Sequence, residues 1–356
     1  MSKKKDDIKK IWRECFNDSA EYVDMYFDRV YTDSQGIILE KNDKPVSSLL
    51  LQPYEMKFHG ATPLIGYIAG AATRKGSRGQ GYMSELMRTA LYEASARDMM
   101  AVALIPATPA LYDFYARMDF APVVMADAQR FTSLHAFSCA GEYERVENPA
   151  DTAVYDAFSA MERERGCTVL HSQQDFLNTI ADINICRGSF VCLRRKGEEE
   201  PVAMAWATEG DDDRIVIKEL LGKDDDSREA AMQAVRDAWP DRPLTLLAPP
   251  PEGRVKRRLM PRGMIRIVNA LKTLEIIARA NPKLTLTLKL TDRLMPENSH
   301  LYRINKGLCD IIADDGGPYD FNVDAQIFSR IVFNSSRMAD VLEFPSVRPW
   351  MSLMLD

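Results

Sequence analysis

Apolar positions in the first 142 residues recur with the spacings of alternating strands and helices. The clearest pattern runs from Met83 to Arg97, where apolar residues at i, i+3, i+4 and i+7 form one stripe that we expect to pack on a sheet. The expected elements, in chain order, are a helix over 19–31, strands over 35–41, 44–58 and 64–73, a helix over 83–97, a strand over 100–106 and a helix that contains 110–118.

A second module, residues 143–258, repeats this order in outline. The expected elements are strands over 189–195, 201–209 and 213–222, an amphipathic helix over 227–239 and a strand over 243–250. The turn into this helix, "GKDDDSRE", holds three consecutive Asp residues, which complement the positive end of the helix dipole and would repel a phosphate. The second module therefore looks like a copy of the first without an anion site.

A third module, residues 259–356, follows the connector "APPPEGRVKRR", which is rich in Pro and Arg. The simplest packing of its elements is a sheet with helices on one face, and the fold class of the whole chain is mixed α/β of the α+β type. The expected elements are a helix over 267–280 that ends at Asn281-Pro282, strands over 284–290, 300–304 and 308–314, and helices over 323–333 and 335–344.

Composition narrows the possible functions. The chain has 356 residues, of which 46% are hydrophobic and 28% charged, as in globular proteins of two or three domains. A net charge of -6 argues against non-specific binding of nucleic acid. No run approaches the ~20 apolar residues of a membrane span, and the basic start lacks the apolar core of a secretory signal, so we expect a cytoplasmic protein without a membrane partner. The six Cys and four His residues are dispersed, so neither a metal site nor a disulfide framework is expected.

The stretch "ATRKGSRGQGYMSEL", residues 72–86, carries the strongest chemical signal. Gly79 and Gly81 permit a tight turn, and the backbone amides up to Ser84 open a helix whose dipole favours anions. Positive charge lies nearby in the sequence, on Arg74, Lys75 and Arg78. The alternative is a tight loop with a solvated basic rim, but an apolar strand before it and a periodic helix after it favour a pyrophosphate site. The absence of GxxxxGK[ST] and of a full GxGxxG disfavours a triphosphate or dinucleotide site.

These residues resemble a known family. "RGQGYM" is similar to the acetyl-CoA signature of the GNAT acyltransferases, with Arg78 and Gly81 matching and Met83 in place of a small residue, and "LYDFYARMDFAPV" resembles a later GNAT segment. The whole chain resembles the Eis (enhanced intracellular survival) acetyltransferases. This resemblance implies tandem GNAT folds, the second degenerate, followed by a domain like sterol carrier protein, at residues 1–142, 143–258 and 259–356.

The resemblance also implies roles for individual residues. Tyr115 would be the general acid that protonates the departing thiolate, although a Tyr on an amphipathic helix is more often a packing residue and Tyr112 lies one turn away. Asp119 stands where a Gly is usual. Ala71 to Thr73 would bind the pantetheine arm and the acetyl carbonyl. The implied acetyl-CoA residues are Ala71, Ala72, Thr73, Arg78, Gly79, Gln80, Gly81, Tyr82, Met83 and Ser84.

The apolar C-terminus, "RPWMSLMLD", raises a second catalytic prediction. Transfer to an amine needs a base, because an ammonium with a pKa near ~10 must first lose a proton. The resemblance implies that the terminal residue, Asp356, enters the active site as this base, with its main-chain or side-chain carboxylate. The alternative is an apolar segment that only completes the core of the third module.

The resemblance therefore implies an acetyl-CoA-dependent N-acetyltransferase that acts by direct transfer on a primary amine, such as an aminoglycoside, a polyamine or a protein lysine. A homo-oligomer, a hexamer in this family, is expected. Two alternatives stay open: a non-catalytic acyl-CoA-binding sensor, and a lipid carrier that uses a cavity in the third module.

Overall fold

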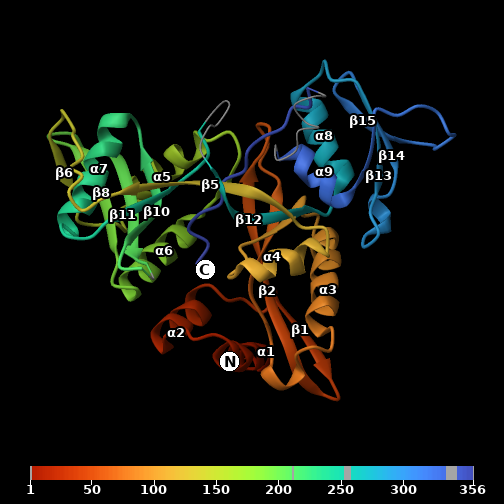
Figure 1. Cartoon of the computed structure of the whole chain (residues 1–356), viewed down its shortest axis with the longest axis horizontal. Coiled ribbons are helices and arrows are strands. Elements are labelled where there is room, and N and C mark those ends of the chain that lie inside the picture. The colour runs from red at the N-terminus through yellow and green to blue at the C-terminus, as the bar shows by residue number, and fades with distance from the viewer. Residues whose placement is uncertain (1, 211, 252–257, 334–342, 356) are drawn as a thin grey trace. The chain divides into compact units, whose positions relative to one another are not determined.

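The computed structural model describes residues 2–210, 212–251, 258–333 and 343–355. The chain divides into two compact units, each assembled from separate stretches of sequence (Figure 1). Unit 1 comprises Met1–Ser19, Tyr31–Val124 and Pro261–Pro349, and unit 2 comprises Ala20–Val30, Met125–Met260 and Trp350–Asp356. The division into three domains at residues 142 and 258 remains a prediction.

Unit 1 contains a mixed sheet, a smaller sheet and the helices that cover them. Its helices are α1 (Lys3–Cys15), α3 (Tyr82–Ala96), α4 (Pro109–Ala116), α8 (Ala270–Ala280), α9 (Ala325–Val332) and the short 3-10 helices η1 (Lys75–Ser77) and η2 (Pro296–Asn298). Its strands are β1 (Gly36–Lys41), β2 (Lys44–Lys57), β3 (Leu64–Thr73), β4 (Ala101–Leu104), β12 (Met260–Ile267), β13 (Leu286–Thr291), β14 (Leu301–Asn305), β15 (Leu308–Ile312) and β16 (Phe321–Asp324).

The mixed sheet has the strand order β1-β2-β3-β4-β12, with β3 and β4 parallel. Consecutive residues of a strand point to opposite faces. A Cβ on Gly36 would meet Ile8 of α1, whereas the next residue, Ile37, belongs to the core cluster that includes α3. Gly70 likewise faces Trp12 of α1. Helices α1 and α3 therefore cover opposite faces of this sheet, as expected for apolar residues on both faces of β2 and β3.

Strand β12 joins this sheet from far along the sequence. It pairs antiparallel with β4, with Met264 opposite Leu104 and Ile267 opposite Ala101. The helix predicted over 267–280 begins too early, because Ile267 is the last residue of β12. Helix α8 begins at Ala270, because the side chain of Asn269 caps it by accepting a hydrogen bond from the Lys272 amide.

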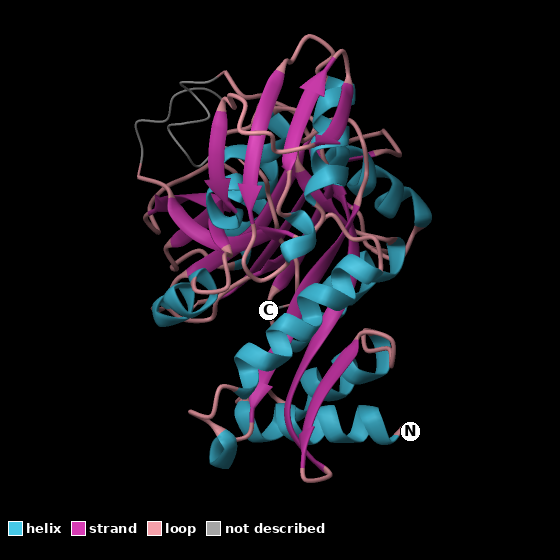
Figure 2. Ribbon diagram, turned by 90° about the vertical axis from the view of Figure 1, so that its right-hand side faces the viewer, coloured by secondary structure: helices cyan, strands magenta, loops and turns pink. Residues whose placement is uncertain are grey.

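The smaller sheet has the order β15-β14-β13-β16. Figures 1 and 2 show α8 and α9 on the same face of it, in agreement with the predicted sheet with helices on one face. Helix α8 ends at its C-cap, Asn281, directly before Pro282, as expected. Most of the helix predicted over 335–344 lies outside the described residues.

Unit 2 is built on the strand order β5-β11-β10-β9-β8-β6. Consecutive residues of β8 and β9 point to opposite faces of the sheet, so the core of unit 2 has two parts. Val191 and Ala205 pack in the cluster with α7. Their neighbours Cys192 and Trp206 pack with α5 and α6. The elements are α2 (Ala20–Arg29), α5 (Thr152–Arg163), α6 (Gln173–Ile185), α7 (Asp225–Ala238), β5 (Ala121–Phe131, which begins in unit 1), β6 (Tyr143–Arg145), β7 (Thr168–Leu170), β8 (Ser189–Arg195), β9 (Pro201–Glu209), β10 (Ile215–Gly222) and β11 (Leu244–Ala248).

The end of the chain also belongs to unit 2. The Trp350 amide donates to the Cys167 carbonyl at 3.0 Å, and the Val169 amide donates to the Trp350 carbonyl at 3.1 Å. Residues 350–355 are buried, and Leu353 packs in the cluster that contains Phe158. The described part of the apolar tail therefore packs on residues of the second module rather than completing the core of the third.

Candidate active site

Strands β3 and β4 pair along only part of their length. Their register runs from Ile65 opposite Ala101 to Tyr67 opposite Ala103, after which β3 continues to Thr73. Beyond Tyr67, main-chain groups on this edge of β3 are free of the β4 ladder and available to a ligand.

A bulge lies in the part of β3 that does not pair with β4. Ser48 of β2 pairs with Ala72 and Leu50 pairs with Ala69, so the register shifts by one residue at Gly70 and Ala71. Gly70 has a φ of 58°, and a Cβ there would lie 2.1 Å from the Trp12 ring. Only glycine fits both the left-handed backbone and this close approach. The bulge turns the end of β3, where Ala71 to Thr73 were predicted to bind the pantetheine arm.

The loop after β3 exposes backbone amides at the start of α3. Gly79 and Gly81 have φ values of 77° and 79°, and open space lies where a Cβ would stand on either residue. Gly81 is the N-cap of α3 and has no side chain to accept hydrogen bonds from the first turn. The N–H groups and the positive end of the α3 dipole are therefore available to an anion.

The corresponding turn of unit 2 is closed by its own side chains. The Asp224 carboxylate caps α7 by accepting from the Ser227 amide at 2.8 Å, and the Ser227 hydroxyl accepts from the Asp224 amide. Asp226 accepts from the amides of Ala140 and Gly141. The prediction that an Asp of this turn complements the helix N-terminus is confirmed for Asp224, whereas Asp226 binds the backbone of residues 140 and 141.

The three cations expected near the loop have different surroundings. Arg78 donates from Nε to the Thr73 carbonyl at 3.2 Å and lies beside the loop. Arg74 instead forms an ion pair with Glu14 and donates from Nε to the Pro45 carbonyl at 2.9 Å. Glu14 also accepts from the Lys75 amide. The charge of Arg74 is therefore largely neutralised, and Arg78 is the better candidate for contact with a phosphate.

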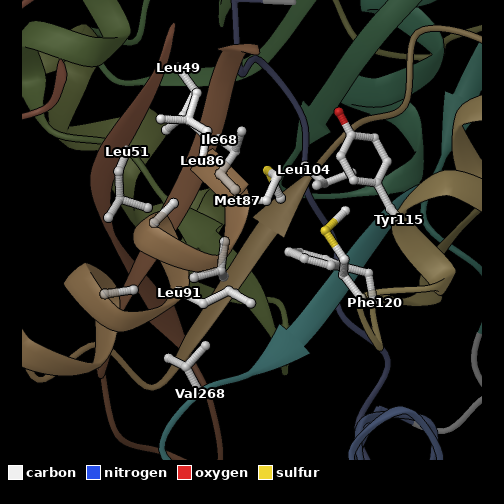
Figure 3. Packing of buried hydrophobic residues seen from close by; sticks show 14 of the residues in the cluster. Leu49, Leu51, Ile68, Leu86, Met87, Leu91, Leu104, Tyr115, Phe120 and Val268 are labelled. Carbon is white, nitrogen blue, oxygen red and sulfur yellow. The ribbon is translucent and has the colours of Figure 1, made fainter. Parts of the chain in front are cut away.

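Tyr115 comes from α4 and is 7% exposed. Its ring packs with Phe120 and Leu104 in the core beneath α3, and its hydroxyl points away from Phe120 (Figure 3). Burial raises the pKa of this phenol to about 12, so it keeps its proton at neutral pH. By contrast, the Tyr112 hydroxyl donates to the Pro261 carbonyl at 3.0 Å. The structure thus distinguishes two tyrosines that the sequence left one turn apart.

Helix α4 ends in a Schellman motif that contains Tyr115. The Phe120 amide donates to the Tyr115 carbonyl and the Asp119 amide donates to the Ala116 carbonyl. The Tyr115 and Phe120 rings, 5.9 Å apart, form the hydrophobic contact that accompanies such a motif. Asp119 holds the left-handed position of this motif, with a φ of 61°, which Gly most often occupies. The turn therefore keeps the geometry of a glycine cap.

These elements line an open cavity of about 430 Å³. Every predicted acetyl-CoA residue except Gln80 lines it, together with Tyr115, and the Gln80 side chain instead accepts a hydrogen bond from the Tyr82 hydroxyl. Further lining residues that were not predicted come from the end of α1, from η1 and from α4. Ser77, Leu111 and Phe114 lie within the two motif segments but were not singled out there, whereas no local motif marks Cys15 and Phe16.

The second predicted catalytic residue, Asp356, lies outside the described residues. The residue before it is fixed in unit 2, because the Tyr22 hydroxyl donates to the Leu355 carbonyl at 2.7 Å. Among the described residues, no group of His, Cys, Asp and Glu has the arrangement of a metal site. A search of the helices in the described ranges also finds none that is long and apolar enough to cross a membrane.

Comparisons with known proteins agree with this geometry. Residues 2–123 match a family described as an acetyltransferase (GNAT) domain. A search of curated proteins found no match.

Solved structures match over nearly the whole chain. A GCN5-related N-acetyltransferase from Anabaena variabilis ATCC 29413 has a TM-score of 0.78 at 15% identity, over 99% of this chain and 97% of that one. A protein of unknown function and probable N-acyltransferase from Enterococcus faecalis V583 has a TM-score of 0.77 at 15% identity, over 97% and 91%. Eis1 from Mycobacterium abscessus has a TM-score of 0.70 at 9% identity, over 96% and 91%. These likenesses show the fold, and with the GNAT domain they support an N-acetyltransferase.

Proposed function

We propose that this chain transfers an acetyl group from acetyl-CoA directly to a primary amine. The observation that carries the proposal is the single cavity wall formed by the free amides at the start of α3, the bulged end of β3 and the buried Tyr115. The first feature suits a pyrophosphate, the second a pantetheine arm and the third a leaving thiolate.

The proposed reaction has one chemical step with both substrates bound. The neutral amine attacks the thioester carbonyl, an N–C bond forms and the C–S bond breaks. Backbone amides between Ala71 and Thr73 stabilise the negative charge on the carbonyl oxygen. The Tyr115 hydroxyl gives its proton to the thiolate, and the proton of the acylated nitrogen passes to a base.

We assign the role of base to the carboxylate of Asp356, as the Eis resemblance implies. Its support is the fixed segment that precedes it. The Glu219 carboxylate accepts from the Trp350 indole and from the Ser352 hydroxyl, and Tyr22 holds the Leu355 carbonyl. A terminal carboxylate has an ordinary pKa near ~3.5 and is a weak base at neutral pH, so it acts through electrostatics, orientation of the amine or a water molecule as much as by direct proton abstraction.

The amine acceptor, of the aminoglycoside, polyamine or lysine type, belongs to the same proposal. A degenerate GNAT fold in residues 143–258, a domain like sterol carrier protein in residues 259–356, a hexameric assembly and a cytoplasmic location also remain predictions from the resemblance. The closed N-terminus of α7 supports the degenerate character of the second fold.

The test is a CoA-release assay over a panel of primary amines. We expect at least one amine to be acetylated, and we expect Tyr115→Phe to lower kcat by about 10²-fold or more. Tyr92→Phe is the matched control, because Tyr92 is half exposed and its hydroxyl bonds to the Leu294 carbonyl, away from the cavity.

A chain extended by several residues beyond Asp356 tests the terminal base, and we expect it to lose turnover while it still binds acetyl-CoA. Full turnover of the extended chain would remove the terminal carboxylate from the mechanism. Binding of acetyl-CoA without acetylation of any amine would instead favour the acyl-CoA sensor.

A further inference from the structure

The position of the Tyr115 hydroxyl depends on how α4 ends. Helix α4 has only eight residues, and Tyr115 lies in its last turn. The backbone then turns sharply through Asp119, whose left-handed φ of 61° is unfavourable for a residue with a Cβ. Such a turn persists only where its surroundings hold it in place.

Gln326 of α9 holds this turn from both sides. Its side-chain nitrogen donates to the Phe120 carbonyl at 2.9 Å and to the Ala116 carbonyl at 3.3 Å. The two carbonyls belong to the residues before and after the strained part of the turn. One amide group therefore bridges the end of α4 and the start of β5.

The position of Gln326 is itself well fixed. Asp324 caps α9 by accepting from the Ile327 amide at 2.7 Å, and Phe328 and Ile331 are buried. A second contact joins the same turn to another distant element, because Asp119 lies 3.8 Å from the guanidinium of Arg266 on β12. Arg266 in turn is held by Asp292 at 2.8 Å. The end of α4 is thus supported by residues that lie beyond the 2–123 range of the GNAT match.

We propose that Gln326 is a positioning residue for Tyr115: by bridging the carbonyls of Ala116 and Phe120, it keeps the phenol directed into the acetyl-CoA cavity. This inference rests on the proposed function, in which Tyr115 is the general acid. It assigns residues of the third module a part in the acetyl transfer of the first.

The experiment is a double-mutant cycle in the full-length chain. Gln326→Met keeps a similar side-chain length and removes both donors, whereas Gln326→Lys restores donors. We expect Gln326→Met to lower kcat by at least fivefold, with less than a twofold change in the Kd for acetyl-CoA, and Gln326→Lys to recover half or more of the rate. Asn322→Ala, at an exposed position just before α9, is the control and should leave kcat unchanged.

The Tyr115→Phe background and amide hydrogen exchange complete the test. If Gln326 acts through Tyr115, Gln326→Met should lower kcat no further in Tyr115→Phe, and exchange over residues 116–121 should become faster. An unchanged kcat in Gln326→Met, or an equal fall in both backgrounds, would overturn the inference. If Tyr115→Phe itself keeps full kcat, the proposed function fails, and faster exchange in Gln326→Met would then reduce Gln326 to a structural residue.

Discussion

The buried carboxylate of Glu219 accepts a hydrogen bond of 3.0 Å from the indole nitrogen of Trp350. The same carboxylate accepts from the Ser352 hydroxyl at 2.5 Å and forms a two-pronged ion pair with Arg165, at 2.7 and 2.8 Å. Because Glu219 lies on β10, its hydrogen bonds with Trp350 and Ser352 join the C-terminal segment to that strand. This network accounts for the apolar character of residues 350–355, which are a buried part of unit 2.

We expect Glu219→Gln to destabilise unit 2 by about 3–5 kcal/mol, because Arg165, whose side chain is only 17% exposed, would lose its buried counter-charge. The measurement is the thermal unfolding of the full chain, together with hydrogen exchange over residues 350–355, which should become faster. Glu200→Gln is the control, since the Glu200–Lys223 pair is exposed and should contribute no more than about 1 kcal/mol. Equal effects of the two substitutions would contradict the role of Glu219.

The same carboxylate predicts a dependence of stability on acid. Burial alone would raise the pKa of Glu219, but the charge of Arg165 and the hydrogen bonds from Ser352 and Trp350 outweigh it and hold the pKa below its ordinary value. The stabilisation is therefore present above the unfolded pKa of about 4.3 and is lost as the pH falls through the lower folded pKa. In parallel unfolding experiments, wild type should lose more stability than Glu219→Gln between pH 5 and pH 3. An equal loss in the two proteins would contradict a stabilising role for the ionised Glu219 carboxylate.

Glycine substitutions test the loop before α3. We expect Gly81→Ala to weaken acetyl-CoA binding about tenfold, because a Cβ in the left-handed region costs roughly 1–2 kcal/mol and the loop must shift to relieve it. Gly79→Ala should act in the same direction. Gly76→Ala is a close control, because Gly76 lies in the same loop, has open space around it and lacks a left-handed φ. Isothermal titration calorimetry gives the Kd of each variant for acetyl-CoA. A similar loss of affinity in Gly76→Ala would show that the loop tolerates no substitution, and the left-handed φ values of Gly79 and Gly81 would then not explain the effect.

The elements with strong local patterns were predictable from sequence. The expected helix over 83–97 is α3, Tyr82–Ala96, and the strands over 189–195 and 201–209 match β8 and β9. Apolar periodicity and turn residues determine such elements locally, because each has one clearly buried face.

The contacts between distant segments were not predictable. Strand β12 follows a Pro- and Arg-rich connector and pairs with β4, which lies far from it in the sequence. For the same reason the sequence could place Tyr115 in a motif but could not show that Gln326, more than 200 residues later, holds the turn behind it. Helices α5 and α6 were not predicted either, and their apolar residues meet their partners only in the folded core of unit 2.

Substitution of Asp119 tests the cost of a side chain in the turn after α4. Burial raises the pKa of this carboxyl, and the negative charges of Asp292 and Asp324 raise it further. The positive charges of Arg266 and Arg293 lower it, but the pKa stays above its ordinary value. A raised folded pKa means that the ionised form at neutral pH is unfavourable. Asp119→Gly and Asp119→Ala both remove the charge, but only Ala keeps a Cβ at a left-handed φ. We expect the Gly variant to be about 1 kcal/mol more stable than the Ala variant by urea unfolding, and equal stabilities would show that the turn is unstrained.

The raised pKa of Tyr115 predicts the shape of the pH–rate profile. An ordinary tyrosine ionises near pH ~10, but burial raises the pKa of Tyr115 to about 12, so the acid keeps its proton across the working range. An amine acceptor with a pKa near ~10 becomes more reactive as the pH rises. We therefore expect kcat/KM for the amine to increase from pH 7 to pH 10 without a descending limb. Tyr115→Phe should give the same shape at a lower rate, because the acid is removed while the titration of the amine is unchanged. The contrary result is a fall in rate between pH 8 and pH 10 in wild type that is absent in Tyr115→Phe. It would mean that Tyr115 loses its proton in this range and that burial does not raise its pKa as described.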